Sequence, residues 1–126
     1  MKLGNLFGKK TAKRETGDNA ERIAETYLHQ HGLTTIARNF QCRYGEIDLI
    51  MQDGESLVFA EVRYRASKDF GGAAASIHVA KQRRIIAAAQ HYLSQISHPP
   101  PCRFDAVLLN KLDIANVEWL KDAFGL

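Results

Sequence analysis

The chain is poor in residues that cross-link or break small folds. Of its 126 residues only two are cysteine, Cys42 and Cys102, and no CxxC spacing is present. Such a pair is typical of reduced thiols in the cytosol, and it argues against a disulfide framework or a zinc site. The three prolines form one run at positions 99–101, where we expect them to end a helix.

Long apolar runs are also missing. No stretch approaches the roughly 18 consecutive apolar residues that a membrane-spanning helix needs, and the first fourteen residues lack the apolar core of a secretory signal. We therefore expect a cytoplasmic protein without a membrane partner. The five histidines show no HExxH spacing, and no GxGxxG or P-loop sequence occurs. A histidine metal site and a nucleotide-binding loop are thus not indicated.

Positive charge gathers at the N-terminus. The first fourteen residues contain five basic residues and no acid, and the rest of the chain has 12 basic and 14 acidic residues. We expect residues 1–16 to form a flexible basic arm and residues 17–126 a single α/β domain. The arm could hold a phosphate backbone by charge, or it could be a solvated terminus that aids solubility. The residues assigned to nucleic-acid binding are Lys9, Lys10, Lys13, Arg14, Arg65, Arg83 and Arg84.

The hydrophobic pattern predicts two helices and five strands. Asp18 followed three positions later by Glu21 predicts a capped helix start, and Gly32 predicts the end of that helix. A second helix, with its inner face on residues 85–96, should end at the prolines. Residues 70–72, Phe-Gly-Gly, predict a mobile loop. The expected strands are residues 33–40, 46–51, 57–64, 104–109 and 114–120. This order predicts a mixed sheet with a helix on each face.

Acidic residues interrupt two of the expected strands. Because side chains alternate along a strand, Glu46 and Asp48 should share one face, while Ile47 and Leu49 point the other way. Acids are depleted in sheets, and burying them is costly unless they are paired or bind metal. The pattern therefore indicates either a metal site or a solvated charged face.

The hairpin register decides which acid meets Glu61 on the following strand. A two-residue turn at residues 53–54 would place Glu46 opposite Glu61. A four-residue loop would instead place Asp48 there. Opposed Cβ atoms lie about 4.5–5.5 Å apart, so in either register two carboxylates could share one divalent cation. Without metal, Arg63 could neutralise a glutamate across the hairpin.

Several short motifs, taken together and in order, resemble a known family. They are Ala20-Glu21, Gly45-Glu46-Ile47-Asp48, the strand ending Glu61-Val62-Arg63, Phe70-Gly71, Lys81 at the start of the second helix, and Arg103-Phe104-Asp105. This order resembles the YraN family of small bacterial proteins within the PD-(D/E)xK nuclease superfamily, and it is similar to archaeal Holliday-junction resolvases. The resemblance covers residues 17–105. It implies a restriction-endonuclease-like fold, a mixed sheet of about five strands flanked by helices.

The resemblance also implies a function, namely a metal-dependent endonuclease that hydrolyses phosphodiester bonds in branched or structured DNA. Asp48 and Glu61 would bind one or two Mg²⁺ or Mn²⁺ ions, with the carbonyl of Val62 as a further ligand. Glu21 would reach the metal from the first helix, and Glu46 would support the site. The metal would lower the pKa of a bound water and neutralise charge on the phosphate. Likeness to resolvases favours a homodimer.

The chain departs from the superfamily pattern at Arg63, where a lysine is usual. A lysine can lose its proton and activate water, whereas arginine stays charged. Arg63 is therefore a candidate for stabilising phosphate charge, and Lys81 is a candidate for supplying an amine from the second helix. The alternative for Lys81 is a solvated lysine in the first helical turn.

Other residues suit ordinary structural roles better. Arg103 and Asp105 lie two positions apart and should share one face of a strand. They either extend the acidic site or form a simple ion pair. Trp119 and Phe124 suit a core or a dimer contact better than a platform for stacking bases.

Two other functions fit the same sequence. A nucleic-acid-binding module that keeps the fold without cleavage would account for Arg63 and the basic arm. It would bind DNA in a salt-dependent manner even without Asp48. A structural or partner-binding protein would carry the acids only as a charged face, and it would bind neither DNA nor metal.

Overall fold

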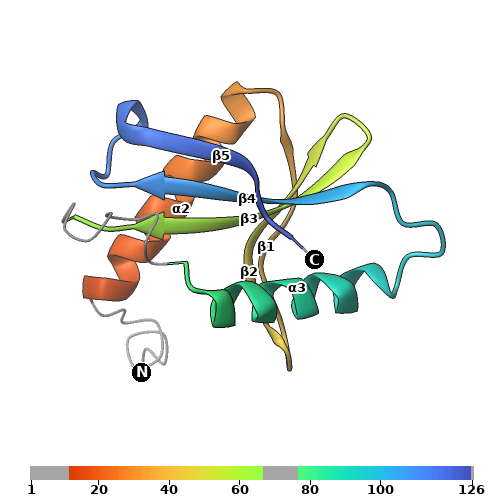
Figure 1. The fold of residues 1–126 in the computed structure, drawn as a ribbon. Helices are drawn as coiled ribbons and strands as arrows, with labels where there is room; N and C mark the ends of the chain where they lie inside the picture. The colour runs from red at the N-terminus through yellow and green to blue at the C-terminus, as the bar shows by residue number, and fades with distance from the viewer. Residues whose placement is uncertain (1–11, 67–76, 126) are drawn as a thin grey trace, which may run out of the picture.

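The structure is a computed structural model that describes residues 12–66 and 77–125. Its elements are α2 (Ala12–Gln30), β1 (Thr34–Cys42), β2 (Gly45–Asp53), β3 (Ser56–Tyr64), α3 (Val79–Leu93), β4 (Cys102–Leu109), the 3-10 helix η3 (Ile114–Asn116) and β5 (Val117–Phe124). The predicted order of helix, three strands, helix and two strands is confirmed (Figure 1). Among the described residues, neither helix is long and apolar enough to cross a membrane.

The five strands form one mixed sheet whose neighbours follow the chain order β1-β2-β3-β4-β5. β3 and β4 are parallel and are connected through α3, whereas the other neighbouring pairs are antiparallel. A parallel pair needs such a crossover because its strands start at the same edge of the sheet. The predicted mixed α/β architecture is therefore confirmed.

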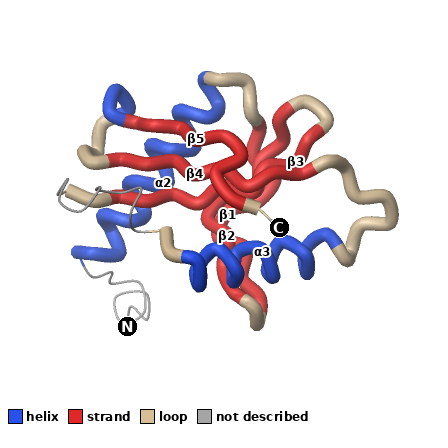
Figure 2. Tube along the Cα trace, in the orientation of Figure 1, coloured by secondary structure: helices blue, strands red, loops and turns tan. Residues whose placement is uncertain are grey.

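The sheet is a middle layer between the two helices (Figure 2). The core under α2 includes Ala20, Ala24, Leu28, Leu49, Met51, Val58, Ala60 and Val107. The core under α3 includes Ile85, Ala88, Ala89, Ile47, Ile50, Leu57, Phe59 and Phe104. β3 is buried on both faces, which accounts for its nearly continuous apolar sequence.

Helix α2 begins earlier than predicted. It starts at Ala12, so Asp18 lies inside the helix and is not its N-cap. The start is earlier because Ala12 and the three residues after it are strong helix formers. The predicted end is confirmed, since Gly32 has φ +91° and the N–H of Leu33 donates to the carbonyl of Leu28 at 3.0 Å. Part of the predicted arm is thus helical, and residues 1–11 lie outside the described residues.

Helix α3 ends earlier than predicted, at Leu93 rather than at the prolines. The hydroxyl of Ser94 donates to the carbonyl of His91 at 2.6 Å, and the N–H of Ser94 donates to Gln90 at 2.9 Å. Ser94 thereby supplies hydrogen-bond partners for carbonyls of the last turn, as a C-terminal cap does. The predicted loop at residues 70–72 lies outside the described residues.

Strand β5 starts later than predicted, at Val117 instead of residue 114. Residues 114–116 form η3, because the carboxylate of Asp113 accepts a hydrogen bond from the N–H of Ala115 at 3.0 Å. This local contact holds a turn where the apolar sequence predicted a strand.

The β2–β3 hairpin has a two-residue turn, one position further along than predicted. Asp53 pairs with Ser56 and Gln52 pairs with Leu57, so the turn residues are Gly54 and Glu55. Gly54 has φ +59°, a conformation that glycine adopts without strain. The pairing of Gln52 with Leu57 is the register predicted for the longer loop, and it brings Asp48 rather than Glu46 opposite Glu61.

Gly45 opens β2 directly against the backbone of α3. A Cβ at Gly45 would lie 3.0 Å from the carbonyl oxygen of Arg84 and 3.2 Å from its Cβ. We expect Gly45→Ala to lower the free energy of unfolding by about 1–3 kcal/mol, because strand and helix must separate. Urea denaturation measures the change. The matched control is Gly17→Ala, where the added Cβ meets nothing within 4 Å inside α2 and helix propensity favours alanine. Equal stability of the two variants would contradict the close packing.

Candidate metal centre

Strand β2 loses its regular pairing at Asp48. On the β1 side, Arg38 pairs with Leu49 and Phe40 with Ile47, but the intervening residues Asn39 and Asp48 are not paired. On the β3 side, pairing ends at Leu49. Asp48 therefore lies where both ladders open.

The interruption changes the face that β2 presents. Ile47 belongs to the core under α3, whereas Leu49 belongs to the core under α2. The prediction that these two side chains point the same way was wrong. Regular alternation of the side chains is therefore interrupted between Ile47 and Leu49.

Asp48 and Glu61 lie side by side in this opening. The Oδ2 atom of Asp48 accepts a hydrogen bond from the N–H of Val62 at 2.8 Å, which replaces a backbone ladder bond and fixes the carboxylate against β3. A hydrogen bond also joins the side chains of Asp48 and Glu61. Glu61 is only 1% exposed. The structure thus brings together the two acids expected to bind metal.

Lys81, in the first turn of α3, reaches the buried acid. Its Nζ atom lies 2.5 Å from Oε2 of Glu61. That oxygen is buried, and within the described part of the chain it makes no contact with good hydrogen-bond geometry. Lys81 is therefore part of the acidic site and not simply a solvated lysine, and it supplies a counter-charge to the buried carboxylate.

Burial raises the pKa of Asp48 well above its usual range. The charge of Glu61 and its hydrogen bond to Asp48 raise this pKa further, as does the charge of Glu21. The N–H of Val62 acts in the opposite direction but is outweighed. The site therefore concentrates carboxylates in a partly desolvated place, where a second positive charge would stabilise their ionised form.

Glu21 faces this pair from α2. Its pKa is raised, first by burial. The hydrogen bond from Asn39 lowers the pKa, but the charges of Glu46, Asp18 and Glu61 raise it. Glu21 therefore lies within electrostatic reach of the Asp48–Glu61 pair.

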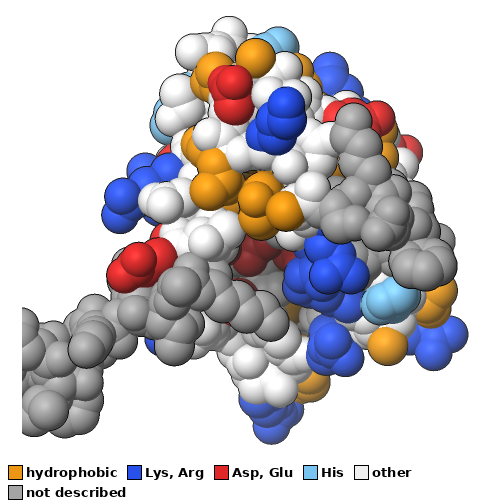
Figure 3. Space-filling model, turned by 90° about the vertical axis from the view of Figure 1, so that its left-hand side faces the viewer, with side chains coloured by type: hydrophobic (Ala, Val, Ile, Leu, Met, Phe, Trp, Pro, Cys, Tyr) orange, Lys and Arg blue, Asp and Glu red, His pale blue; other side chains and the backbone are white. Residues whose placement is uncertain are grey.

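Glu21, Asp48 and Lys81 line a pocket of about 490 Å³, whereas the buried Glu61 is not among its lining residues. Its lining comprises Thr16, Gly17, Ala20, Glu21, Asp48, Val62, Arg63, Tyr64, Arg65, Ala66 and Lys81. Figure 3 looks onto the end of the molecule where β3 ends and α3 begins, and it shows acidic side chains at the floor of a hollow with Lys and Arg side chains beside it. Arg63 and Arg65 are thus placed to meet an anion approaching the acids.

The other predicted nucleic-acid contacts lie outside this pocket. Arg14, Arg83 and Arg84 are exposed on the two helices. Lys9 and Lys10 lie outside the described residues, as does the side chain of Lys13. Phosphate binding by the basic arm therefore stays a prediction.

The donor set suits a sparsely coordinated divalent cation. No three Asp, Glu, His or Cys side chains among the described residues form a ready-made metal cluster. However, Asp48 and Glu61 offer adjacent carboxylates, and Lys81 contacts Oε2 of Glu61 as their present counter-charge. Mg²⁺ commonly takes one or two protein carboxylates and keeps several waters. The residues present therefore fit Mg²⁺ or Mn²⁺ in such a mode.

The sequence matches the model of the uncharacterised protein family UPF0102 over residues 20–109. The chain belongs to this family. Similar UPF0102 proteins occur in Methylobacillus flagellatus, with 54% identity covering 89% of this chain and 98% of the relative, and in Nitrosospira multiformis, with 51% identity covering 90% and 95%. A third, from Janthinobacterium sp. strain Marseille, is 53% identical over 98% of both chains. The resemblance to the YraN family, which is UPF0102, is confirmed.

Sequence reasoning missed two polar residues of this UPF0102 chain. Asn39 donates hydrogen bonds from Nδ2 to Oε1 of Glu21 at 2.9 Å and to Oε1 of Glu46 at 3.4 Å. An asparagine inside a predicted strand was the available signal, because strands are depleted in this residue. Glu25 is also buried, and it binds the guanidinium of Arg38. The helical spacing of α2 places Glu25 on the side of the helix that faces the sheet.

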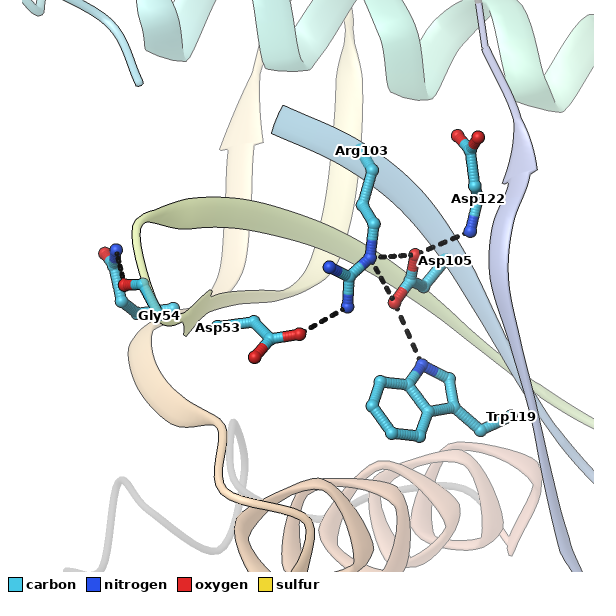
Figure 4. Close-up of polar contacts among 7 residues, drawn as sticks. Asp53, Gly54, Arg103, Asp105, Trp119 and Asp122 are labelled. Atoms are coloured by element: carbon cyan, nitrogen blue, oxygen red, sulfur yellow. Dashed lines mark hydrogen bonds and ion pairs between the residues drawn. The ribbon is translucent and has the colours of Figure 1, made fainter. Parts of the chain in front are cut away.

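Asp105 belongs to a separate buried network and not to the pocket (Figure 4). Its carboxylate accepts hydrogen bonds from Nε of Arg103 at 3.0 Å and from Nε1 of Trp119 at 2.9 Å. Arg103 also binds Asp53 at 2.8 Å. The ion-pair interpretation of Arg103 and Asp105 is therefore confirmed. Trp119 packs on the α2 core, and Phe124 stacks on the core residue Phe104, as expected for structural aromatics.

Proposed function

We propose that this UPF0102 protein is a metal-dependent nuclease that hydrolyses phosphodiester bonds in DNA. The observation that supports the proposal most strongly is the Asp48–Glu61 pair, held where two strand ladders open, with Asp48 lining a pocket that Arg63 and Arg65 also line. Isolated carboxylates in a sheet are costly and persist where they are paired or bind metal. From the resemblance to junction resolvases we further propose that the substrate is branched DNA and that the protein acts as a homodimer.

The roles of the side chains follow from their positions. Asp48 and Glu61 would hold the cation, with the carbonyl of Val62 as a further ligand. When bound, the cation lowers the pKa of a bound water and neutralises charge on the phosphate. The N–H of Val62 keeps Asp48 oriented, because it donates to Oδ2.

The cationic side chains near the acids would have two different roles. Arg63 and Arg65 line the pocket and would bind phosphate oxygens. Arg63 cannot act as a base because its guanidinium stays charged. Lys81, whose amine contacts Glu61, is the side chain that would hold or transfer a proton at the attacking water. A lysine contributed by α3 would therefore replace the lysine usually found at the position of Arg63.

One observation favours the second candidate, a nucleic-acid-binding module without catalysis. The ammonium of Lys81 already contacts Glu61, so the site has a partial counter-charge without a metal. In that case the pocket would bind a phosphate through its arginines, and DNA binding would not depend on Asp48.

Metal titration by calorimetry, combined with a cleavage assay, separates the candidates. Mn²⁺ and Mg²⁺ are titrated into wild type, Asp48→Asn, Glu61→Gln and the control Glu118→Gln, which alters an exposed acid on β5. Each protein is then assayed on linear, flapped and four-way DNA. We expect metal binding and cleavage by wild type and the control, and loss of both in the two site variants. DNA binding that is unchanged in Asp48→Asn and needs no metal would favour the binding module.

A further inference from the structure

Asn39, an exposed residue of β1 near the acidic site, has an unusual backbone conformation. Its φ is +49°, and among described residues other than glycine only Asp122 shares a positive φ. Asn39 is also the β1 residue that would pair with Asp48 in a regular ladder. A left-handed residue inside a strand is held by its surroundings, and such strain gathers at functional sites.

The amide of Asn39 joins two acids from different elements. Nδ2 donates to Glu21 of α2 and to Glu46 of β2. Glu46, Asp18 and Glu61 act electrostatically on Glu21, so repulsion opposes its position beside the pocket. The Asn39 amide offsets part of this repulsion, because its N–H groups donate to both carboxylates, at 2.9 Å to Glu21 and 3.4 Å to Glu46.

We propose that Asn39 is a positioning residue that holds Glu21 toward the Asp48–Glu61 pair and thereby sets the affinity of the site for a divalent cation. This inference rests on the proposed function. The left-handed backbone takes Asn39 out of the ladder, and its amide bridges to α2. Groups that orient ligands through hydrogen bonds typically change metal affinity by about 10–100-fold when they are removed.

The test uses Asn39→Gly in the full chain. Glycine adopts φ near +49° without strain, so this variant removes the amide and leaves the backbone conformation accessible. The matched control is Asp122→Gly, the same kind of exchange at the other left-handed position, on β5 and away from the pocket lining. Calorimetry with Mn²⁺ measures affinity, and urea denaturation measures stability.

We expect Asn39→Gly to bind Mn²⁺ about 10–100-fold more weakly than wild type, while Asp122→Gly binds as wild type does. If Asn39 acts through Glu21, adding Asn39→Gly to Glu21→Gln should cause little further loss, because the two residues form one unit. A general structural role would instead lower stability and leave the affinity of the folded protein unchanged.

Two results overturn the inference and are distinguishable. Wild-type Mn²⁺ affinity in Asn39→Gly, with binding still lost in Asp48→Asn, refutes the role of Asn39 and leaves the proposed function standing. Failure of wild type to bind Mn²⁺ refutes the proposed function and this inference together.

Discussion

Asp48→Asn is expected to unfold at a higher urea concentration than wild type at pH 8. The substitution removes a carboxylate that burial and its acidic neighbours disfavour, while the amide oxygen can still accept from Val62. We expect a gain of roughly 1–2 kcal/mol in the free energy of unfolding. A residue whose removal stabilises the fold is retained for another purpose, in keeping with the trade-off between stability and activity.

The pH dependence gives this prediction its sign. The pKa of Asp48 is higher in the folded protein than in the unfolded chain. Between these two pKa values the folded state binds more protons, so its stability falls as pH rises through that window. Asp48→Asn removes this loss, and its advantage should therefore be larger at pH 8 than at pH 5. An Asp48→Asn protein that is less stable than wild type at pH 8, with Glu118→Gln unchanged, would contradict the argument.

Asp105→Ala is expected to have the opposite and larger effect. Asp105 is 0% exposed and accepts hydrogen bonds from Arg103, Trp119 and the N–H of Asp122. Its loss leaves a partly buried guanidinium with only one of its two counter-ions, Asp53, and two further donors without this acceptor. We expect a loss of about 3–5 kcal/mol in the free energy of unfolding, a large part of the stability of a small domain.

The comparison variant for Asp105 is Trp119→Phe, which removes one donor and keeps an aromatic ring. Loss of one hydrogen bond should cost only about 1 kcal/mol. Because Asp105 does not line the pocket, the folded fraction of Asp105→Ala should bind Mn²⁺ with wild-type affinity. A stability within 1 kcal/mol of wild type would show that the network contributes less than its burial indicates.

The sequence predicted the layered fold because its signals were periodic and agreed with one another. Alternating or continuous apolar runs marked the strands, and helical spacing marked the inner faces of both helices. The boundaries that were wrong depend on single polar contacts. Asp18 resembled a cap but follows a run of strong helix formers, while Asp113 holds a turn where a strand was expected.

The sequence predicted which acids form the site, but it did not predict the geometry of the strand that carries them. Asp48 and Glu61 were candidates because acids are unusual in strands, and the structure selects the register that places them together. The left-handed Asn39 and the change of face between Ile47 and Leu49 were not predictable from alternation, because both depart from regular strand geometry. The irregular stretch around Asn39 and Asp48 is also where the chemistry is proposed.

The pairing of β4 with β3 has a consequence for the integrity of the site. The pocket-lining residues all precede residue 82, so β4 and β5 supply none of its side chains. Yet β4 pairs with β3 from Leu57 to Tyr64, the whole stretch that carries Glu61. Without β4, that stretch would present unpaired N–H and C=O groups to any other chain able to add a strand. Strands β4 and β5 thus protect the site from aggregation without contributing to its chemistry.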